Sequence, residues 1–322
     1  MLEPASRIHE RNIPFQVQDV EESVGPVTEK DVTIVLPVLN EEKGVVAVID
    51  DIRSNGFPNI LVVDGYSVDN TVAAAGANGV EVAGQHGGGK TGAIITAIER
   101  VSTPYLLVMD GDYTYDAADI RKFLYHANYY DEIVGARKSE NISRLHRLGN
   151  GFLCALFNAL LGTHFSDVCS GMYLLRTSAA RHLVLQTRGF SVEAEVLAQM
   201  SLLGRATEVP INYRTRIGKA KLVTWVHGFE ILKSIVELAR IYNPVFLFSI
   251  TTASAAIPGL AILLWVFWEW VSGFGFHNGW AITGEILLIV GIQAFFVGTL
   301  ALLMKRSELR IERVVKRGID HR

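Results

Sequence analysis

The stretch Tyr105-Leu-Leu-Val-Met-Asp110-Gly-Asp112 places two acidic side chains directly after a short apolar run. Such a run predicts a buried strand, and the two aspartates then stand where that strand opens into a loop. Carboxylates at positions i and i+2 can jointly hold a divalent cation, because Mg²⁺ and Mn²⁺ prefer oxygen ligands and often bridge carboxylates to substrate phosphates. A turn or a helix cap is the competing interpretation of an Asp-x-Asp pair, so the surrounding sequence has to decide.

Short apolar runs alternate with helix-like segments on both sides of this stretch. Further strands are predicted over residues 32–39, 59–65, 80–84 and 132–137, and helices over residues 41–56, 91–101 and 116–128. This alternation is typical of an α/β domain whose mostly parallel, Rossmann-like sheet has helices on both faces. Ligands of such sheets bind beyond the carboxyl ends of the strands.

The predicted carboxyl ends of these strands are rich in acids, glycines and cations. They fall at residues 37–41, Asp64, residues 84–90, residues 110–112 and Arg137. Exposed backbone N–H groups and cations suit the phosphates of a nucleotide diphosphate. We therefore expect a nucleotide-diphosphate pocket at this edge of the sheet.

Two uncharged apolar runs characterise the last quarter of the chain. Residues 245–267 and 286–304 provide about 23 and about 19 residues, each enough to cross roughly 30 Å of hydrocarbon. The connection between them has no Lys or Arg, whereas basic residues flank the outer ends of both runs. This asymmetry predicts a two-helix transmembrane hairpin in the cell membrane, with the catalytic domain and both termini in the cytoplasm. Two buried core helices are the alternative.

These patterns divide the chain into five segments. We expect a charged N-terminal arm over residues 1–30, a catalytic domain over 31–218, an interfacial amphipathic helix over 219–243, the hairpin over 244–304 and a basic cytoplasmic tail over 305–322. A second apolar stripe, over residues 148–162, is either interfacial or part of the core. The net charge of −3 gives no nucleic-acid footprint, and the two cysteines are expected to be reduced thiols.

A glycine-rich segment supports a rival interpretation. Residues 84–91, Gly-Gln-His-Gly-Gly-Gly-Lys-Thr, match the phosphate-binding loop pattern GxxxxGK[ST] between a predicted strand and a predicted helix. A membrane-anchored P-loop NTPase is therefore the alternative from another functional class. Two acid-tipped strands already precede this loop, and the second aspartate, Asp112, is not needed by an NTPase at that position. The match indicates phosphate affinity rather than ATP hydrolysis.

Ordered motifs along residues 31–304 carry a family resemblance. Residues 36–41 (LPVLNE), 62–71 (VVDGYSVDNT), 89–90 (GK) and 110–112 (DGD) resemble family 2 glycosyltransferases with the GT-A fold. Residues 135–137, 147–150, 167–172, 189–195 and 208–216 narrow the similarity to polyprenyl-phosphate sugar synthases. Within that group the chain is most similar to the archaeal dolichyl-phosphate hexosyltransferases of protein N-glycosylation (the AglJ and AglK type).

The resemblance implies a role for particular residues. Donor binding would use Pro37, Leu39, Asn40, Glu41, Asp64, Lys90, Asp110, Gly111 and Arg216. Asp110 and Asp112 would hold Mg²⁺ or Mn²⁺, Arg137 and Arg147 would bind the acceptor phosphate, and Asp167 would face the sugar or the acceptor. The catalytic group implied is Asp112, Asp167, Arg137 and Arg147.

Each of these assignments has a structural alternative. Arg137 and Arg147 could instead pair with Asp131, Glu132 or Asp167. Lys90 could be a solvated turn residue, and Glu193 and Glu195 could be ordinary helix surface.

The resemblance implies an inverting hexosyltransferase of N-glycosylation. It would move glucose, N-acetylglucosamine or another hexose from a nucleotide-diphosphate sugar, UDP-linked by expectation, to dolichyl or polyprenyl monophosphate. The alternative within the family is a dolichyl-phosphate mannose synthase that uses GDP-mannose. Leu39, Gly65, Tyr66 and Thr114 depart from the usual family residues and count against that donor. Association through the membrane spans into a homo-oligomer is a further possibility.

Overall fold

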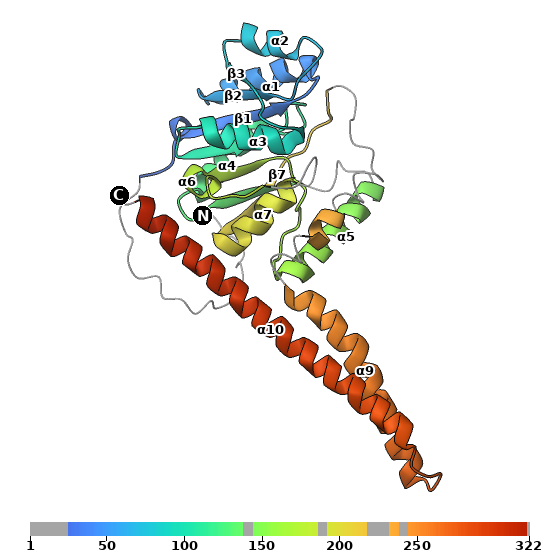
Figure 1. The fold of residues 1–322 in the computed structure, drawn as a ribbon. Coiled ribbons are helices and arrows are strands. Elements are labelled where there is room, and N and C mark those ends of the chain that lie inside the picture. Colours follow the sequence, from blue (N-terminus) through green and yellow to red (C-terminus); the bar gives the residue numbers. More distant parts are fainter. Residues whose placement is uncertain (1–24, 138–143, 186–191, 218–231, 238–243, 321–322) are drawn as a thin grey trace, which may run out of the picture.

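The computed structural model describes residues 25–137, 144–185, 192–217, 232–237 and 244–320. They form an α/β head and a long helical hairpin that extends away from it (Figure 1). The predicted arm (1–30) and interfacial helix (219–243) lie mostly outside the described residues.

The head is organised around a seven-stranded mixed sheet in the order β3-β2-β1-β4-β6-β5-β7. The strands are β1 (Val32–Val38), β2 (Ile60–Asp64), β3 (Glu81–Gly84), β4 (Tyr105–Val108), β5 (Glu132–Arg137), β6 (Tyr173–Arg176) and β7 (Ala206–Ile211). β6 runs antiparallel to both of its neighbours, and the other pairings are parallel. The predicted α/β class, the mostly parallel sheet and the five predicted strands are confirmed; β6 and β7 were not among the predicted strands.

Helices cover both faces of this sheet. They are α1 (Glu42–Ser54), α2 (Thr71–Ala77), α3 (Gly89–Arg100), α4 (Ile120–His126), α5 (Arg144–Leu161), α6 (Thr177–Ala180) and α7 (Val192–Leu203), with short 3₁₀ turns η1 (Glu29–Asp31) and η2 (Ala117–Asp119). Alternate residues of β1 supply the two cores, because successive strand side chains point to opposite faces. Val35 belongs to the core cluster that includes residues of α3, α5 and α7, whereas Ile34 and Leu36 belong to the cluster that includes residues of α1 and α4.

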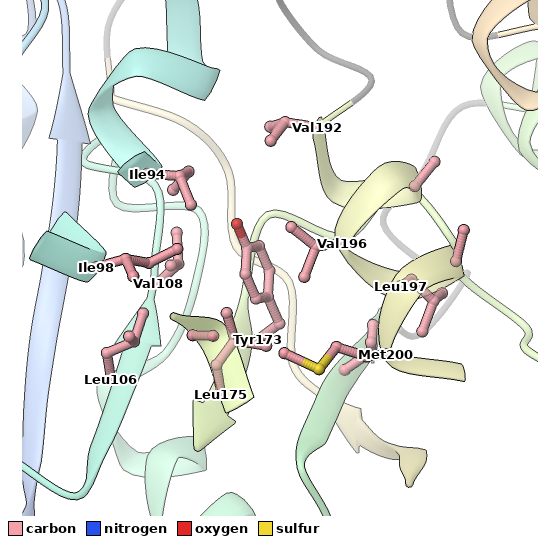
Figure 2. Packing of buried hydrophobic residues seen from close by; sticks show 14 of the residues in the cluster. Ile94, Ile98, Leu106, Val108, Tyr173, Leu175, Val192, Val196, Leu197 and Met200 are labelled. Atoms are coloured by element: carbon pink, nitrogen blue, oxygen red, sulfur yellow. The ribbon is translucent and has the colours of Figure 1, made fainter. Parts of the chain in front are cut away.

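Tyr173 of β6 joins two helices of the first core. Figure 2 shows its ring between Ile94 and Ile98 of α3 and Val196 and Met200 of α7. Large buried aromatic side chains of this kind dominate packing energy, because they remove the most apolar surface from water. The packing therefore fixes α3 and α7 relative to each other.

The apolar stripe of α5 belongs mainly to the protein core. Phe157 and Leu160 are fully buried, Leu161 is buried too, and Phe152 alone of these large side chains is 60% exposed. The core interpretation of residues 148–162 is therefore correct, and the interfacial one is wrong for most of the stripe. Of the second predicted interfacial segment, residues 232–237 are described as helical, and Ile235 packs into the same core.

The hairpin consists of α9 (Pro244–Val271) and α10 (Asn278–Asp320). Within them, Phe248–Val271 and Asn278–Met304 are long and apolar enough to cross a membrane, by length and composition. Only 17% and 11% of the most apolar windows are buried, so these helices do not have the burial expected of the core-helix alternative. The predicted tail, residues 305–322, continues α10 as helix as far as Asp320.

Small residues bring the two hairpin helices into close contact. Gly284, Gly291 and Gly298 recur every seven residues along α10. A Cβ at Gly291 would lie 2.6 Å from the Cβ of Ala256, and one at Gly284 would lie 3.1 Å from the carbonyl oxygen of Gly259. Close backbone approach at such positions is how helices associate where lipid supplies no hydrophobic drive between them.

Substituting Gly291→Leu is expected to lower the apparent melting temperature in detergent, because the new side chain overlaps α9. Overpacking of this kind costs about 1–3 kcal/mol. Gly279→Leu is the matched control, since a Cβ at Gly279 meets nothing within 4 Å. Equal melting temperatures of the two variants would show that the hairpin tolerates separation.

Candidate active site

The carboxyl edge of the sheet gathers strained backbone. Asn40, Tyr66 and Tyr113 have φ values of 51°, 67° and 68°, and they follow β1, β2 and β4. Left-handed backbone is unfavourable for side chains with a Cβ and persists where surrounding contacts hold it, often at binding sites. The strain marks the edge at which the sequence predicts a ligand.

Asp110 and Asp112 lie together at the end of β4. Asp112 is buried; its Oδ1 accepts hydrogen bonds from the Thr114 backbone N (3.1 Å) and Oγ1 (2.5 Å), and its Oδ2 lies 3.1 Å from Nη1 of Arg216. Burial, and then repulsion from Asp110, raises the pKa of Asp112. Two carboxylates that repel each other in a partly buried site are stabilised by a cation between them. The turn and cap interpretation explains one oxygen of Asp112 but not this pairing.

This pair fits a divalent metal that takes its other ligands from substrate. Within the described residues, no group of three or more His, Cys, Asp or Glu side chains is arranged to hold a metal. Mg²⁺ commonly binds one or two carboxylates and completes its shell with phosphates and water. The chemistry of Asp110 and Asp112 therefore suits a metal–diphosphate site rather than a closed protein cage.

Gly171 forms the wall behind Asp110. A Cβ there would overlap the carboxylate of Asp110, so glycine leaves room for that carboxylate in its present position. The backbone N–H of Gly171 donates to the hydroxyl of Tyr115 over 2.7 Å. The loop before β6 thus fixes the place of the first aspartate.

Lys90 lies at the start of α3 and reaches two acids. Its Nζ is 2.5 Å from Oδ1 of Asp110 and 2.6 Å from Oε1 of Glu193, and its side chain is 13% exposed. Burial works to lower the pKa of Lys90, but the two carboxylates raise it well above the ordinary value. The solvated-turn alternative for Lys90 is therefore wrong, and so is the helix-surface alternative for Glu193 and Glu195, which are both buried.

These contacts also bear on the phosphate-loop alternative. In a P-loop NTPase the loop lysine reaches the β- and γ-phosphates. Here Lys90 is held by Asp110 and Glu193, and Thr91 is buried. The loop starts from β3, the edge strand of the sheet. The geometry gives the lysine a role at the Asp110 site instead.

The loops after β1 and β2 hold each other. Asn40 donates from its backbone N to Oγ of Ser67 (2.8 Å), and its Oδ1 accepts from the N of Val68 (2.8 Å). Asp64 accepts from the backbone N of Tyr66 (3.0 Å) and Ser67 (3.1 Å). Of the predicted donor-binding residues, Asn40 and Asp64 therefore hold these two loops together, while Leu39 presents a side chain that is 45% exposed. Pro37, within β1, is partly buried.

Arg216 reaches two acids, one in the segment after β1 and one in the segment after β4. It pairs with Glu41 and also reaches Asp112, and its Nε is buried without a hydrogen-bond partner among the described residues. The backbone N of Ile217 donates to the carbonyl of Asp112 over 3.0 Å, which anchors the segment. Glu41 orients Arg216 beside the aspartate pair, and its predicted role in donor binding stays a prediction.

Arg137 and Asp167 form a two-pronged ion pair. Nε and Nη2 of Arg137 lie 2.6 and 2.8 Å from the two oxygens of Asp167, and Asn150 donates to the same carboxylate over 3.2 Å. Asp167 is 2% exposed. The pairing alternative for Arg137 is therefore confirmed with Asp167 as its partner, and the role of Asp167 toward the sugar or acceptor stays a prediction. The Arg137 guanidinium also lies over the ring of Tyr213 (5.3 Å). Arg147 is exposed on α5, one turn before Asn150.

Sequence reasoning missed some members of this site. Tyr115 supports Gly171, and Glu193 holds Lys90. Glu193 lies in a quoted motif but carries no local sign of its partner, because 103 residues separate it from Lys90. Gly111, predicted to bind donor, packs against Val38, so its lack of a side chain serves strand packing as well.

Comparisons with known proteins agree with the family resemblance of the sequence. The family model described as "Glycosyl transferase family 2" matches residues 33–184. "Glycosyltransferase AglJ" of Haloferax volcanii is 32% identical over 279 residues, which cover 84% of this chain and 92% of that protein. "Dolichyl-phosphate hexose transferase" of the same organism is 33% identical over 215 residues, covering 65% and 93% of the two chains.

Solved structures show the same fold. Glucosyl-3-phosphoglycerate synthase from Mycobacterium tuberculosis in complex with UDP superposes with a TM-score of 0.56 at 18% identity, over 65% of this chain and 80% of that one. Its complex with Mn²⁺, UDP-glucose and phosphoglyceric acid gives a TM-score of 0.54 at 19% identity, over 65% and 79% of the two chains. At this identity the likeness concerns the fold alone.

Proposed function

The chain belongs to glycosyl transferase family 2, and on this premise we propose that it transfers a hexose from a UDP-sugar to dolichyl or polyprenyl monophosphate with inversion, as an early step of protein N-glycosylation. The observation that carries the proposal is the cluster of Asp110, Asp112 and Arg216 at the carboxyl edge of a GT-A-like sheet, in a chain that also contains an apolar hairpin. The relative named "Dolichyl-phosphate hexose transferase" supports the acceptor.

Asp110 and Asp112 are the residues that would hold Mg²⁺ or Mn²⁺. When bound, the ion neutralises the charge that develops on the departing nucleoside diphosphate. Glucosyl-3-phosphoglycerate synthase, which shares this fold, has been solved with Mn²⁺ or Mg²⁺, which is consistent with a divalent cation; the choice of Asp110 and Asp112 rests on their own chemistry. Arg216 supplies a second positive group at the same place, oriented by Glu41.

The donor pocket follows from the loops after β1 and β2. We assign Pro37, Leu39 and Asn40 to its nucleoside side, together with Asp64, whose carboxylate closes the second loop. Electrostatic groups fixed in advance by the fold lower the barrier, because they need no rearrangement as charge develops. Lys90 contributes a cation near the diphosphate.

The acceptor side uses Arg137 and Arg147. A phosphate monoester with a second pKa near 6 is largely dianionic at neutral pH, so the attacking oxygen needs no general base. Asp167 holds Arg137 in one orientation, and Arg147 is exposed on α5 one turn before Asn150, which donates to the same carboxylate. Positioned arginines of this kind align the phosphate for in-line attack at the anomeric carbon. A single displacement converts an α-linked donor sugar into a β-linked lipid phosphate.

The hairpin brings the enzyme to its lipid. Basic residues at the outer ends of the two helices support a topology with residues 31–218 and both termini in the cytoplasm. In this arrangement residues 244–304 span the bilayer and 305–322 remain cytoplasmic. Confining enzyme and acceptor to one surface raises their effective concentration.

The test is transfer from a panel of radiolabelled UDP- and GDP-sugars to dolichyl phosphate, in detergent, with Mg²⁺, Mn²⁺ or EDTA. We expect label in the lipid phase from one UDP-sugar, with loss of transfer in EDTA. Labelling from GDP-mannose alone would assign the chain to the mannose synthases. ATP hydrolysis without lipid labelling would overturn the proposal in favour of the phosphate-loop alternative.

A further inference from the structure

Lys90, Asp110 and Glu193 form a buried ion cluster built from three segments. Lys90 begins α3, Asp110 follows β4 and Glu193 begins α7, and the lysine Nζ lies between the two carboxylates at 2.5 and 2.6 Å. The side chains of Lys90 and Glu193 are only 13% and 7% exposed. Donor binding does not explain either of these two ion pairs. One of the two acids, Asp110, is also a proposed metal ligand.

One carboxylate oxygen of the cluster makes no hydrogen bond within the described part of the chain. Oε2 of Glu193 is buried and has no hydrogen-bond partner among the described residues. A lysine ammonium can donate three hydrogen bonds, and a carboxylate can accept from it through both oxygens. An unused buried carboxylate oxygen is costly unless another state of the site uses it. Two donors lie near this oxygen: the Tyr173 hydroxyl, which is itself buried without a partner among the described residues, and the Lys90 ammonium. Lys90 already contacts the other oxygen of the same carboxylate, so its flexible side chain can reach Oε2 by a small movement.

We propose that Glu193 is a positioning residue that lets Lys90 act as an internal counterion: Lys90 neutralises Asp110 while the metal is absent, and shifts wholly onto Glu193 when a divalent cation binds. The inference rests on the proposed metal site at Asp110 and Asp112. The ammonium and the divalent cation compete for the same carboxylate, since like charges in a poorly solvated site repel strongly. Glu193 gives the displaced ammonium a partner, because a buried charge without one is strongly unfavourable.

The packing around the cluster keeps Glu193 in place for this role. Tyr173 lies between α3 and α7 and belongs to the same buried cluster as residues of both helices (Figure 2). The N-termini of these helices, which carry Lys90 and Glu193, therefore keep a fixed separation. Only the end of the lysine side chain has to move between the two carboxylates.

The proposal is tested by Mn²⁺ binding to the full-length protein in detergent, without donor, with free Mn²⁺ measured by electron paramagnetic resonance. Lys90→Met removes the competitor and is expected to bind Mn²⁺ about tenfold more tightly, within the usual range for coupling between two sites. Glu193→Gln leaves Lys90 with Asp110 as its sole acidic partner in the cluster and is expected to weaken Mn²⁺ binding about tenfold. Lys122→Met is the matched control, since Lys122 pairs with Asp119 elsewhere, and should leave the affinity unchanged.

The double variant Lys90→Met/Glu193→Gln separates this mechanism from simple charge effects. It removes both buried charges and keeps the side-chain volumes, so it should fold even if a single variant does not; near-ultraviolet circular dichroism checks this for each protein. If Glu193 acts through Lys90, the double variant binds Mn²⁺ as tightly as Lys90→Met. If Glu193→Gln weakens binding equally with and without Lys90, the inference is wrong.

The proposed function and this inference fail in different ways. A wild-type protein that binds no Mn²⁺, or an Asp112→Asn variant that binds it as tightly as wild type, would overturn the metal site itself. If wild type binds Mn²⁺ through Asp112 while Lys90→Met shows unchanged or weaker affinity, the metal site stands and the counterion role of Lys90 is rejected.

Discussion

Asp112→Asn is expected to lower sugar transfer by about a hundredfold to a thousandfold, the loss that follows removal of one preorganised electrostatic contact in an active site. The substitution keeps the shape of the side chain and its capacity to accept the hydrogen bonds of Thr114. It removes the negative charge that would hold the metal and that faces Arg216. The measurement is the initial rate of transfer to dolichyl phosphate at saturating donor and metal.

Two controls define the meaning of that loss. The variant should insert into membranes and elute from a sizing column as wild type does, because Asp112 makes no contact with the hairpin in the described structure. Asp116→Asn is a comparison at a nearby acid that pairs with Arg214 instead. Transfer by Asp112→Asn within a factor of about three of wild type would remove Asp112 from the proposed metal site.

Arg137→Met is expected to lower stability and to abolish transfer at the same time. The substitution leaves Asp167, which is 2% exposed, without its two hydrogen bonds from the guanidinium. Removing one partner of a buried ion pair costs about 3–5 kcal/mol, because the remaining charge is not solvated. We expect the apparent melting temperature in detergent to fall by about 10 °C, measured by differential scanning fluorimetry.

A second substitution separates the structural role of Arg137 from its proposed role at the acceptor phosphate. Arg137→Met/Asp167→Asn carries no buried charge at this position and is expected to recover most of the lost stability. Transfer should stay low, with a raised KM for dolichyl phosphate, because the phosphate has lost one of its two arginines. Recovery of transfer together with stability would show that Arg137 serves the fold alone and that Arg147 carries the acceptor contact.

The two substitutions address opposite ends of the site. Asp112 belongs to the leaving-group side, where Arg216 reinforces it, and Arg137 to the proposed acceptor side, where Asp167 orients it. Since the chain belongs to a family of sugar transferases, a defect on either side should stop the same reaction. The dependence on donor, metal and acceptor concentration then identifies which side each residue serves.

The sequence alone predicted the sheet, its ligand edge and the hairpin. Each depends on a local pattern. A short apolar run such as Tyr105–Val108 predicts a buried strand, and the length of a longer apolar run indicates whether it can cross a bilayer. Asp110 and Asp112 were identified in the same way, because the apolar run directly before them indicates that they stand at the end of a strand. The short antiparallel strand β6 gave no such signal, since its four residues resemble any brief apolar segment.

The tertiary structure decided which charged groups meet. Arg216 pairs with Glu41 across 175 residues of chain, Lys90 reaches Glu193 across 103, and Arg137 is held by Asp167 across 30. No local pattern identifies such partners, because an ion pair depends on distances that only the path of the chain through the sheet brings to a few ångströms. For the same reason the apolar stripe of α5 could be assigned to core or membrane surface only once its neighbours were in place. Composition and periodicity indicate whether a side chain is buried away from water, whereas the fold determines which groups it contacts there.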